Sequence, residues 1–409
     1  MKIWLKLCLG MLLGSLVGFY LPPESAGATG VSFLARLFLQ IGRYLVVPTI
    51  FFSFFMGIFE LRLHKKLILT LGKSILYGCA LSVCLMILGV VYIGILSPSR
   101  LPILSTLPLT VQVPSLSELV LRIFPVNAFT IFIEGGDYLV PILVLSFLLG
   151  VNLTFNRQAA RPIVELFDSL SRLFWHMNLF LTEFLYIPLI FISSSLVFTL
   201  RKVQDLRIYH SFLLHLTVLT VIISLIVFPV LFYLIHQKRK PFRWLFAQIG
   251  PGIAAIVSGD VLWAYGQLAR HGHEMLGLTR KSGAVSNPIV LVFSRSGTAL
   301  ITLVSFLFIF RSYSSLELGL LQTLGVMFLA LLISVSLWAA PGTGALVAIL
   351  LLSRLFGRGL EEGYLILGPI MPILISLGAF LDILSASFVS YWVADKASEL
   401  RPEEECRNI

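Results

Sequence analysis

Apolar runs long enough to cross a lipid bilayer recur along the whole chain. Two examples are LILTLGKSILYGCALSVCLMILGVVYIGIL (residues 67–96) and FLLHLTVLTVIISLIVFPVLFYLI (residues 212–235). A bilayer core about 30 Å thick is crossed by an apolar helix of about 20 residues, whose backbone groups pair internally. Of the 409 residues, 58% are hydrophobic and 12% are charged, too few polar residues to cover a soluble domain of this length. The sequence predicts an all-α polytopic membrane protein.

Six spans are expected in the first part of the chain. The first has a basic start and an apolar middle, so it is either an uncleaved helix, which the many later spans favour, or a cleaved signal peptide. The second, third and fifth exceed about 20 residues, which predicts tilted or protruding helices. The expected spans are residues 3–21, 31–60, 66–97, 124–155, 160–196 and 208–236.

The formal net charge of +10 comes largely from basic clusters between the spans, at residues 62–66, 236–243 and 270–281. The positive-inside rule places such clusters in the cytoplasm, so we expect both termini there, in an inner or plasma membrane. This distribution explains the charge without a nucleic-acid partner; the expected surroundings are the lipid bilayer. His271 and His273 are only two residues apart, but that spacing alone does not predict a metal site.

Two apolar segments after residue 240 are interrupted by glycine and proline. The first covers residues 241–276, with breaks at Gly250–Gly252 and Ser258–Asp260, and the second covers residues 318–357, with a break at Ala339–Ala345. Each segment is either a kinked complete span or a re-entrant hairpin, of the kind that brings helix ends to a substrate near the membrane midplane. The repeated pattern favours a pair of hairpins.

Arg295 lies between Ser294 and Ser296 in the middle of another apolar run, residues 287–310. A guanidinium at the centre of a bilayer costs about 2.5–3.5 kcal/mol on insertion scales, so such a residue faces protein or water and pairs with an acid. Asp382, inside the last span, and Asp260, at a predicted hairpin tip, are the two candidate partners.

The order of six spans, hairpin, span, hairpin and span is similar to the dicarboxylate/amino acid:cation symporter family, which includes the glutamate transporters. Residues 39–58 resemble the second helix of that family, residues 124–153 its fourth, and Pro341–Leu346 the tip of its second hairpin. Ser294–Leu300 falls where the family carries Asn-Met-Asp-Gly-Thr, with Gly and Thr matched.

The resemblance implies eight transmembrane helices plus two re-entrant hairpins, a homotrimer and an elevator-like movement. It implies a scaffold (1–65 and 99–200), a transport domain (66–98 and 201–397) and a cytoplasmic tail (398–409). We therefore expect a secondary active transporter of a small carboxylate or amino acid, without enzymatic activity or a cofactor. A receptor or anion channel on the same fold, and a membrane enzyme using His271 and His273, are the alternatives.

The chain departs from the family at its Na⁺ positions, where Ser294 and Ser296 replace an amide and a carboxylate. The last helix lacks the family's arginine and keeps one internal acid, Asp382. In an alignment with the family, Asp382 falls either at the family's Asn or at the Asp that binds the substrate's amino group. The alignment to the Asn requires fewer gaps. Three roles are open for Arg295. Its positive charge replaces that of a bound cation, its planar guanidinium binds a substrate carboxylate through two hydrogen bonds, or it forms an ion pair with an acid that only fastens two helices together. Na⁺, H⁺ or no ion remain as coupling alternatives.

The substrate is expected between the two hairpin tips, with Arg295 and Asp382 at its polar ends. The sequence shows no Walker loop, zinc spacing or Gly-x-Ser-x-Gly motif, which leaves an ATP-driven pump or a hydrolase without support. The expected substrate-binding residues are Ser258, Gly259, Asp260, Arg295, Thr298, Pro341, Gly342, Thr343, Gly344, Asp382 and Ser385.

Overall fold

The computed structural model describes residues 3–96, 121, 123–133, 139–153, 157–203, 206–236, 241–313, 319–336, 344–357 and 363–402. Within these ranges all regular elements are helices, and β pairing is limited to an isolated bridge between Leu278 and Leu400. Six helical runs in the described chain are long and apolar enough to cross a membrane, and a bent helix pair makes a seventh candidate. The prediction of an all-helical polytopic membrane protein is confirmed.

The first three expected spans are helices α1 (Ile3–Tyr20), α2 (Ala26–Leu63) and α3 (Leu67–Ile95). Basic side chains hold the C-terminal ends of two of them. Nη1 of Arg201 donates to the carbonyl of Phe19 at 2.7 Å, in the last turn of α1, and Nη1 of Arg311 donates to the carbonyl of Ile93 at 2.6 Å, in α3. The last carbonyls of a helix lack intrahelical partners and carry partial negative charge, so these arginines stabilise both ends.

The fourth and fifth spans differ from the expected outlines. The described part of the fourth comprises α5 (Thr130–Ile133) and α6 (Leu139–Asn152). Residues 160–196, expected as one tilted helix, fall in α7 (Arg157–Glu183) and α8 (Tyr186–Arg201), which are bent by 62°. Pro188 explains the break, because its ring would collide with the carbonyl of Phe184 in a continuous helix.

The sixth span combines four elements: η1 (Leu206–Tyr209), α9 (His210–Ile222), the π-helical turn η2 (Ile223–Val227) and α10 (Phe228–Ile235). A proline in a regular α-helix collides with the carbonyl four residues before it. For Pro229 that carbonyl belongs to Leu225, and the wider π turn contains this residue.

The first interrupted segment forms the short helices α11 (Pro241–Ala247), α12 (Ile249–Ser258) and α13 (Val261–Glu274). Gly259 connects α12 to α13 in a left-handed conformation, with φ of 62°, and Oδ1 of Asp260 accepts the N–H of Leu262 at 2.9 Å to begin α13. The predicted break at Gly250–Gly252 is wrong, since these residues lie inside α12; α11 and α12 are separated at Gln248 instead.

The run around Arg295 is also interrupted, although the sequence reads as one helix. It consists of α14 (Arg280–Phe293) and α15 (Ser296–Tyr313), separated by Ser294 and Arg295. Helices α16 (Leu320–Ser336) and α17 (Gly344–Phe356) follow, then η3 (Gly363–Ile370) and α18 (Met371–Lys396). The predicted tip residues Pro341, Gly342 and Thr343 lie outside the described residues, and Gly344 begins α17.

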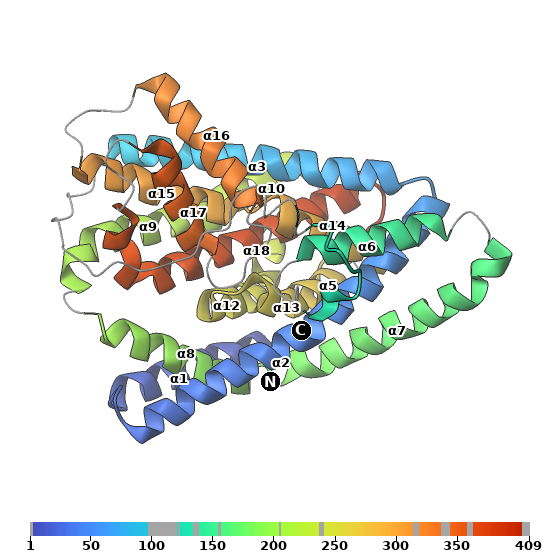
Figure 1. Ribbon diagram of the computed structural model, residues 1–409, viewed down its shortest axis with the longest axis horizontal. Coiled ribbons are helices and arrows are strands. Elements are labelled where there is room, and N and C mark those ends of the chain that lie inside the picture. The colour runs from blue at the N-terminus through green and yellow to red at the C-terminus, as the bar shows by residue number, and fades with distance from the viewer. Residues whose placement is uncertain are drawn as a thin grey trace.

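Figure 1 shows α1, α2, α7 and α8 on one side of the molecule and α3, α15, α16 and α17 on the other. The α12–α13 pair and α18 lie between these two groups. Helix α18 is buried along most of its length and contacts α12, α14, α15 and α3. The interruption between α14 and α15 therefore faces a helix that is buried along most of its length.

Candidate functional site

The break between α14 and α15 places Arg295 against Asp382 in the middle of α18. Both side chains are buried, with 4% and 1% exposed, and Nε of Arg295 donates to Oδ2 of Asp382 at 3.4 Å. Of the two predicted acid partners, the structure pairs Arg295 with Asp382. An ion pair this deeply buried has lost its hydration, so its remaining hydrogen-bond capacity must be used inside the protein.

Asp382 also forms the N-terminal cap of α15. Its Oδ1 accepts the backbone N–H of Gly297 at 2.7 Å and of Thr298 at 3.0 Å, and its Oδ2 accepts the Thr298 hydroxyl at 2.6 Å. A Cβ at position 297 would lie 2.4 Å from the carbonyl oxygen of Gly378, so only glycine allows α15 and α18 to approach this closely. The negative carboxylate suits the positive end of the helix dipole.

Two polar atoms beside this pair have no hydrogen-bond partner among the described residues: Nη1 of Arg295 and Oγ of Ser385, one turn after Asp382. A buried donor without an acceptor costs about 1–3 kcal/mol, and more when it is charged. The site therefore offers a guanidinium N–H and a hydroxyl to an acceptor that the described chain does not supply.

Asp260, the other predicted partner of Arg295, is bound elsewhere. Its Oδ2 accepts Nε of Arg43 from α2 at 2.7 Å, and its side chain is 1% exposed. Ser258 stabilises the same turn, because its Oγ accepts the N–H of Asp260 at 3.1 Å and donates to the carbonyl of Ala254 at 2.7 Å. Arg43 was not among the residues predicted for the site, although a cation inside an apolar span is the signal that identifies it.

Ser294 and Ser296, at the expected family Na⁺ positions, form a closed triangle with Ser82 of α3. The Oγ atoms lie 3.2 Å apart for Ser82 and Ser294, 2.9 Å for Ser82 and Ser296, and 3.1 Å for Ser294 and Ser296. All three are buried. The hydroxyls satisfy one another and supply no negative charge, so they do not resemble a carboxylate cation site. Ser82 is an ordinary serine within a span and gave no sequence signal.

His271 and His273 lie in the last turns of α13, and each ring nitrogen Nδ1 is within 2.9 Å of a backbone carbonyl, that of Gln267 or Leu278. The described residues contain no group of three or more His, Cys, Asp and Glu side chains able to hold a metal ion. The contacts of the two histidines are those of side chains that stabilise the end of a helix.

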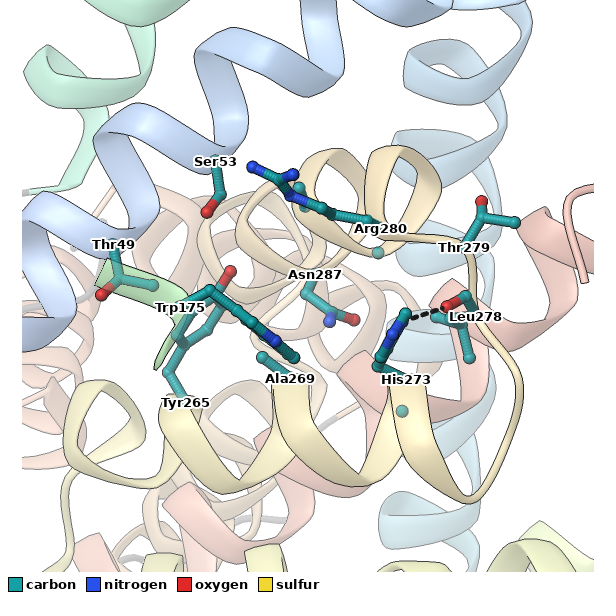
Figure 2. Close-up of a pocket in the computed structure, with 13 residues that line it drawn as sticks. Thr49, Ser53, Trp175, Tyr265, Ala269, His273, Leu278, Thr279, Arg280 and Asn287 are labelled. Carbon is teal, nitrogen blue, oxygen red and sulfur yellow. Dashed lines mark hydrogen bonds between the residues drawn. The ribbon is translucent and has the colours of Figure 1, made fainter. Parts of the chain in front are cut away.

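A cavity of about 50 Å³ lies between α2, α7, α13 and the start of α14. Figure 2 shows Thr49 and Ser53 on α2 facing Tyr265, Ala269 and His273 on α13 across it. None of the lining residues belongs to the Arg295–Asp382 pair, so the cavity is separate from the candidate site.

Comparison with known proteins assigns the whole helical region to one family. The model of the sodium:dicarboxylate symporter family matches residues 3–396. A C4-dicarboxylate transport protein from Laribacter hongkongensis is 23% identical over 182 residues, 42% of this chain and 40% of that protein. A proton/sodium-glutamate symport protein from Geobacillus stearothermophilus is 23% identical over 186 residues, 42% of this chain and 43% of that protein. These matches thus span less than half the length of either relative, whereas the family model spans nearly the whole chain. The chain belongs to the sodium:dicarboxylate symporter family.

Proposed function

We propose that this protein is a secondary active transporter that carries a small carboxylate or amino acid across the inner or plasma membrane by an elevator-type movement. The family and the names of two relatives, a C4-dicarboxylate transport protein and a proton/sodium-glutamate symport protein, support transport over the receptor and channel alternatives. Helices α12 and α13 have 10 and 14 residues, each too short to cross a bilayer at 1.5 Å per residue, which supports a re-entrant hairpin.

In this proposal the protein has eight transmembrane helices plus two re-entrant hairpins, α12–α13 and α16–α17, and assembles as a homotrimer. Helices α1, α2, α6, α7 and α8 belong to the scaffold, and α3, α9–α10 and α12–α18 belong to the moving unit. Both termini lie in the cytoplasm.

The observation that carries the proposal is the unpartnered Nη1 of Arg295, buried beside the α14–α15 break. The Nε atom of the same guanidinium is held by Asp382, which orients the planar group. Guanidinium N–H groups bind carboxylates through charge-assisted hydrogen bonds. Arg295 thereby binds the substrate carboxylate and takes the place of the arginine that the last helix lacks.

The contacts of Asp382 indicate that the site binds a carboxylate group of the substrate and not an amino group. An ionised carboxylate has about four acceptor positions. Two N–H groups occupy Oδ1, and the Thr298 hydroxyl and Nε of Arg295 occupy Oδ2, so all of them are in use. An ammonium group would have to displace one of these donors, which supports dicarboxylates as preferred substrates over amino acids.

The serine triangle supports a second part of the proposal, that Na⁺ coupling is weakened or lost. Ser296 stands where the resemblance expects a carboxylate and Ser294 where it expects an amide, so the site loses one negative charge, while Arg295 supplies one permanent positive charge beside it. Because a guanidinium stays protonated at any accessible pH, it needs no ion from solution. The coupling ion, if one is used, is then H⁺ or a residual Na⁺.

The test is substrate-induced thermal stabilisation of the purified protein, with a panel of dicarboxylates and amino acids in Na⁺ or choline buffer. A ligand at about 100 times its Kd stabilises the folded state by about 2.7 kcal/mol. We expect a dicarboxylate to stabilise the protein equally in both buffers, and Arg295→Met to abolish this effect. Arg161→Met is the matched control, since Arg161 is 79% exposed on α7. Stabilisation that requires Na⁺, or that survives Arg295→Met, would contradict the proposal.

A further inference from the structure

A buried polar seam joins the α2–α7 group to the α13–α14 group. On α7, residues Asp168, Ser171, Asn178 and Thr182 follow helical spacing along one face and contact the opposite group. Nδ2 of Asn178 donates to the carbonyl of Gly266 at 3.2 Å, and Nε2 of Gln267 donates to the carbonyl of Thr182 at 3.0 Å. Under the proposed function, this seam is the boundary between the scaffold and the moving unit.

An ion pair closes each described end of the seam. At one end, Arg43 of α2 donates to Asp260 at 2.7 Å. At the other end, Arg280 of α14 lies 3.1 Å from Asp168 of α7 and donates to Ser171 at 2.6 Å. The charges alternate between the two sides of the seam. The α2–α7 side contributes the cation Arg43 and the anion Asp168, and the α13–α14 side contributes the anion Asp260 and the cation Arg280. A shift of α13 and α14 together by one helical turn, about 5.4 Å, would therefore separate both pairs.

Trp263 fixes the position of α13 beside the first pair. Its indole ring covers Gly42 of α2, where a Cβ would lie 2.2 Å from the ring, and its Nε1 donates to the carbonyl of Phe38 at 3.3 Å. The Trp263 ring is 3% exposed, and of the adjacent pair Asp260 is 1% and Arg43 is 28% exposed, so the carboxylate end of the pair is shielded from solvent. A shielded pair is weakened less by water and salt than an exposed one.

The middle of the seam is less tightly packed, because it contains the cavity shown in Figure 2. The side chains that face each other there, Thr49 and Ser53 on α2 and Tyr265 on α13, leave about 50 Å³ between them. Dispersion contacts are lost across such a gap. Apolar packing is therefore reduced beside the cavity, and the polar contacts along the seam, including the ion pairs at its ends, help to hold this position.

We propose that Arg43 and Asp260 form an ionic lock that holds the α12–α13 hairpin against α2 in the state described here, and that the lock opens whenever the moving unit leaves this position. Arg43 is then a positioning residue for the transport cycle. The inference rests on the proposed function for its meaning in transport, but the lock itself is a property of the seam and can be tested without a substrate.

The experiment uses Thr49→Cys as a reporter in the full-length protein in lipid vesicles, with the four native cysteines replaced by serine. Thr49 is 2% exposed and lines the 50 Å³ cavity, so a maleimide larger than the cavity reacts only after the seam opens. We expect Arg43→Gln and Asp260→Asn each to raise the labelling rate about tenfold, equivalent to about 1.4 kcal/mol. Asparagine keeps the capping ability of position 260 while removing its charge.

Three comparisons decide the result. Arg161→Gln, which removes an exposed arginine from α7, should leave labelling unchanged. The double variant should label no faster than either single variant, because both remove the same interaction. Ser305→Cys, buried in α15 away from the seam, should keep its labelling rate in the lock variants. Unchanged Thr49→Cys labelling, or equal acceleration of the Ser305→Cys reporter, would overturn the lock.

Uptake of a dicarboxylate by the same vesicles separates the lock from the proposed function. Accelerated labelling without uptake in any variant would reject transport and keep the lock. Saturable uptake with unchanged labelling in the lock variants would reject the lock and keep transport.

Discussion

Glu399 joins three elements at the end of α18, outside the candidate membrane spans. Its side chain is 5% exposed, with Oε1 lying 2.7 Å from Nζ of Lys66 and Oε2 lying 3.1 Å from Nζ of Lys281. The Thr279 hydroxyl also donates to Oε2, at 3.3 Å. One carboxylate thus connects the segment after α18 to the start of α3 and to the start of α14.

These contacts predict a loss of stability in acid. Burial raises the pKa of Glu399, but hydrogen bonds from Lys66 and Lys281 outweigh it and lower the pKa below its ordinary 4.5. A lowered folded-state pKa contributes stability that is present above the unfolded value and is lost as the pH falls through the folded value. Thermal unfolding of the native protein and Glu399→Gln should differ most near neutral pH and converge below about pH 4.5. A difference that does not change with pH would exclude an ionised Glu399.

At the scale of single residues, the sequence identified the acid and the cation of the candidate site but not their surroundings. Arg295 and Asp382 were recognisable because ionisable residues inside apolar spans must find partners. Arg43 satisfied the same rule, yet it lay in a stretch that the family resemblance already explained. Ser82 was not predictable, since serine in a membrane helix usually bonds to its own backbone and its partners come from a distant helix.

At the scale of elements, the contact between α15 and α18 depends on Gly297. A Cβ there would lie 2.5 Å from Cβ of Leu381 and 2.7 Å from the backbone N of Asp382. Neither neighbour is a flexible chain end, so the helices would have to separate and the Asp382 cap would be weakened.

Gly297→Ala should therefore destabilise the protein by about 1–3 kcal/mol, the usual cost of overpacking, and should weaken dicarboxylate binding. Thermal unfolding and ligand-induced stabilisation measure the two effects. Gly325→Ala is the matched control, because a Cβ on that helical glycine of α16 meets nothing within 4 Å. The control is expected to be neutral or stabilising by up to about 1 kcal/mol. Equal stability of the two variants would contradict the close packing of α15 on α18.

The length of the apolar runs in the sequence predicts that the helices exist. Where some of the helices are interrupted depends on contacts with distant parts of the chain. The breaks at Gly259 and Pro188 obey local rules for glycine and proline. The break at Ser294 and Arg295 has no such residue, since neither is a helix breaker. It exists because Asp382, 87 positions away from Arg295, takes the N–H groups that begin a new helix at Ser296. A carboxylate from another helix is invisible to a local pattern.

At the scale of the whole molecule, the paired charges of Arg295 and Asp382 cancel within the moving unit of the proposed transporter. If no cation joins the substrate, the loaded unit carries the negative charge of the bound carboxylate across the membrane. Each elementary charge moved through 100 mV changes the free energy by about 2.3 kcal/mol. Uptake should then respond to membrane potential in the direction opposite to that of a transporter that carries excess cations.

Proteoliposomes with imposed K⁺ diffusion potentials test this directly. Initial uptake of a dicarboxylate should increase when the vesicle interior is positive, and replacing Na⁺ by choline should change it by less than about twofold, equivalent to about 0.4 kcal/mol. Protein-free vesicles give the passive background. Faster uptake at interior-negative potential in Na⁺ would mean that cations accompany the substrate, so that the serine triangle and Arg295 would not have replaced them. Faster uptake at interior-negative potential in choline buffer at low external pH would identify H⁺ as the accompanying ion. Protons would then be the cation whose concentration the uptake follows.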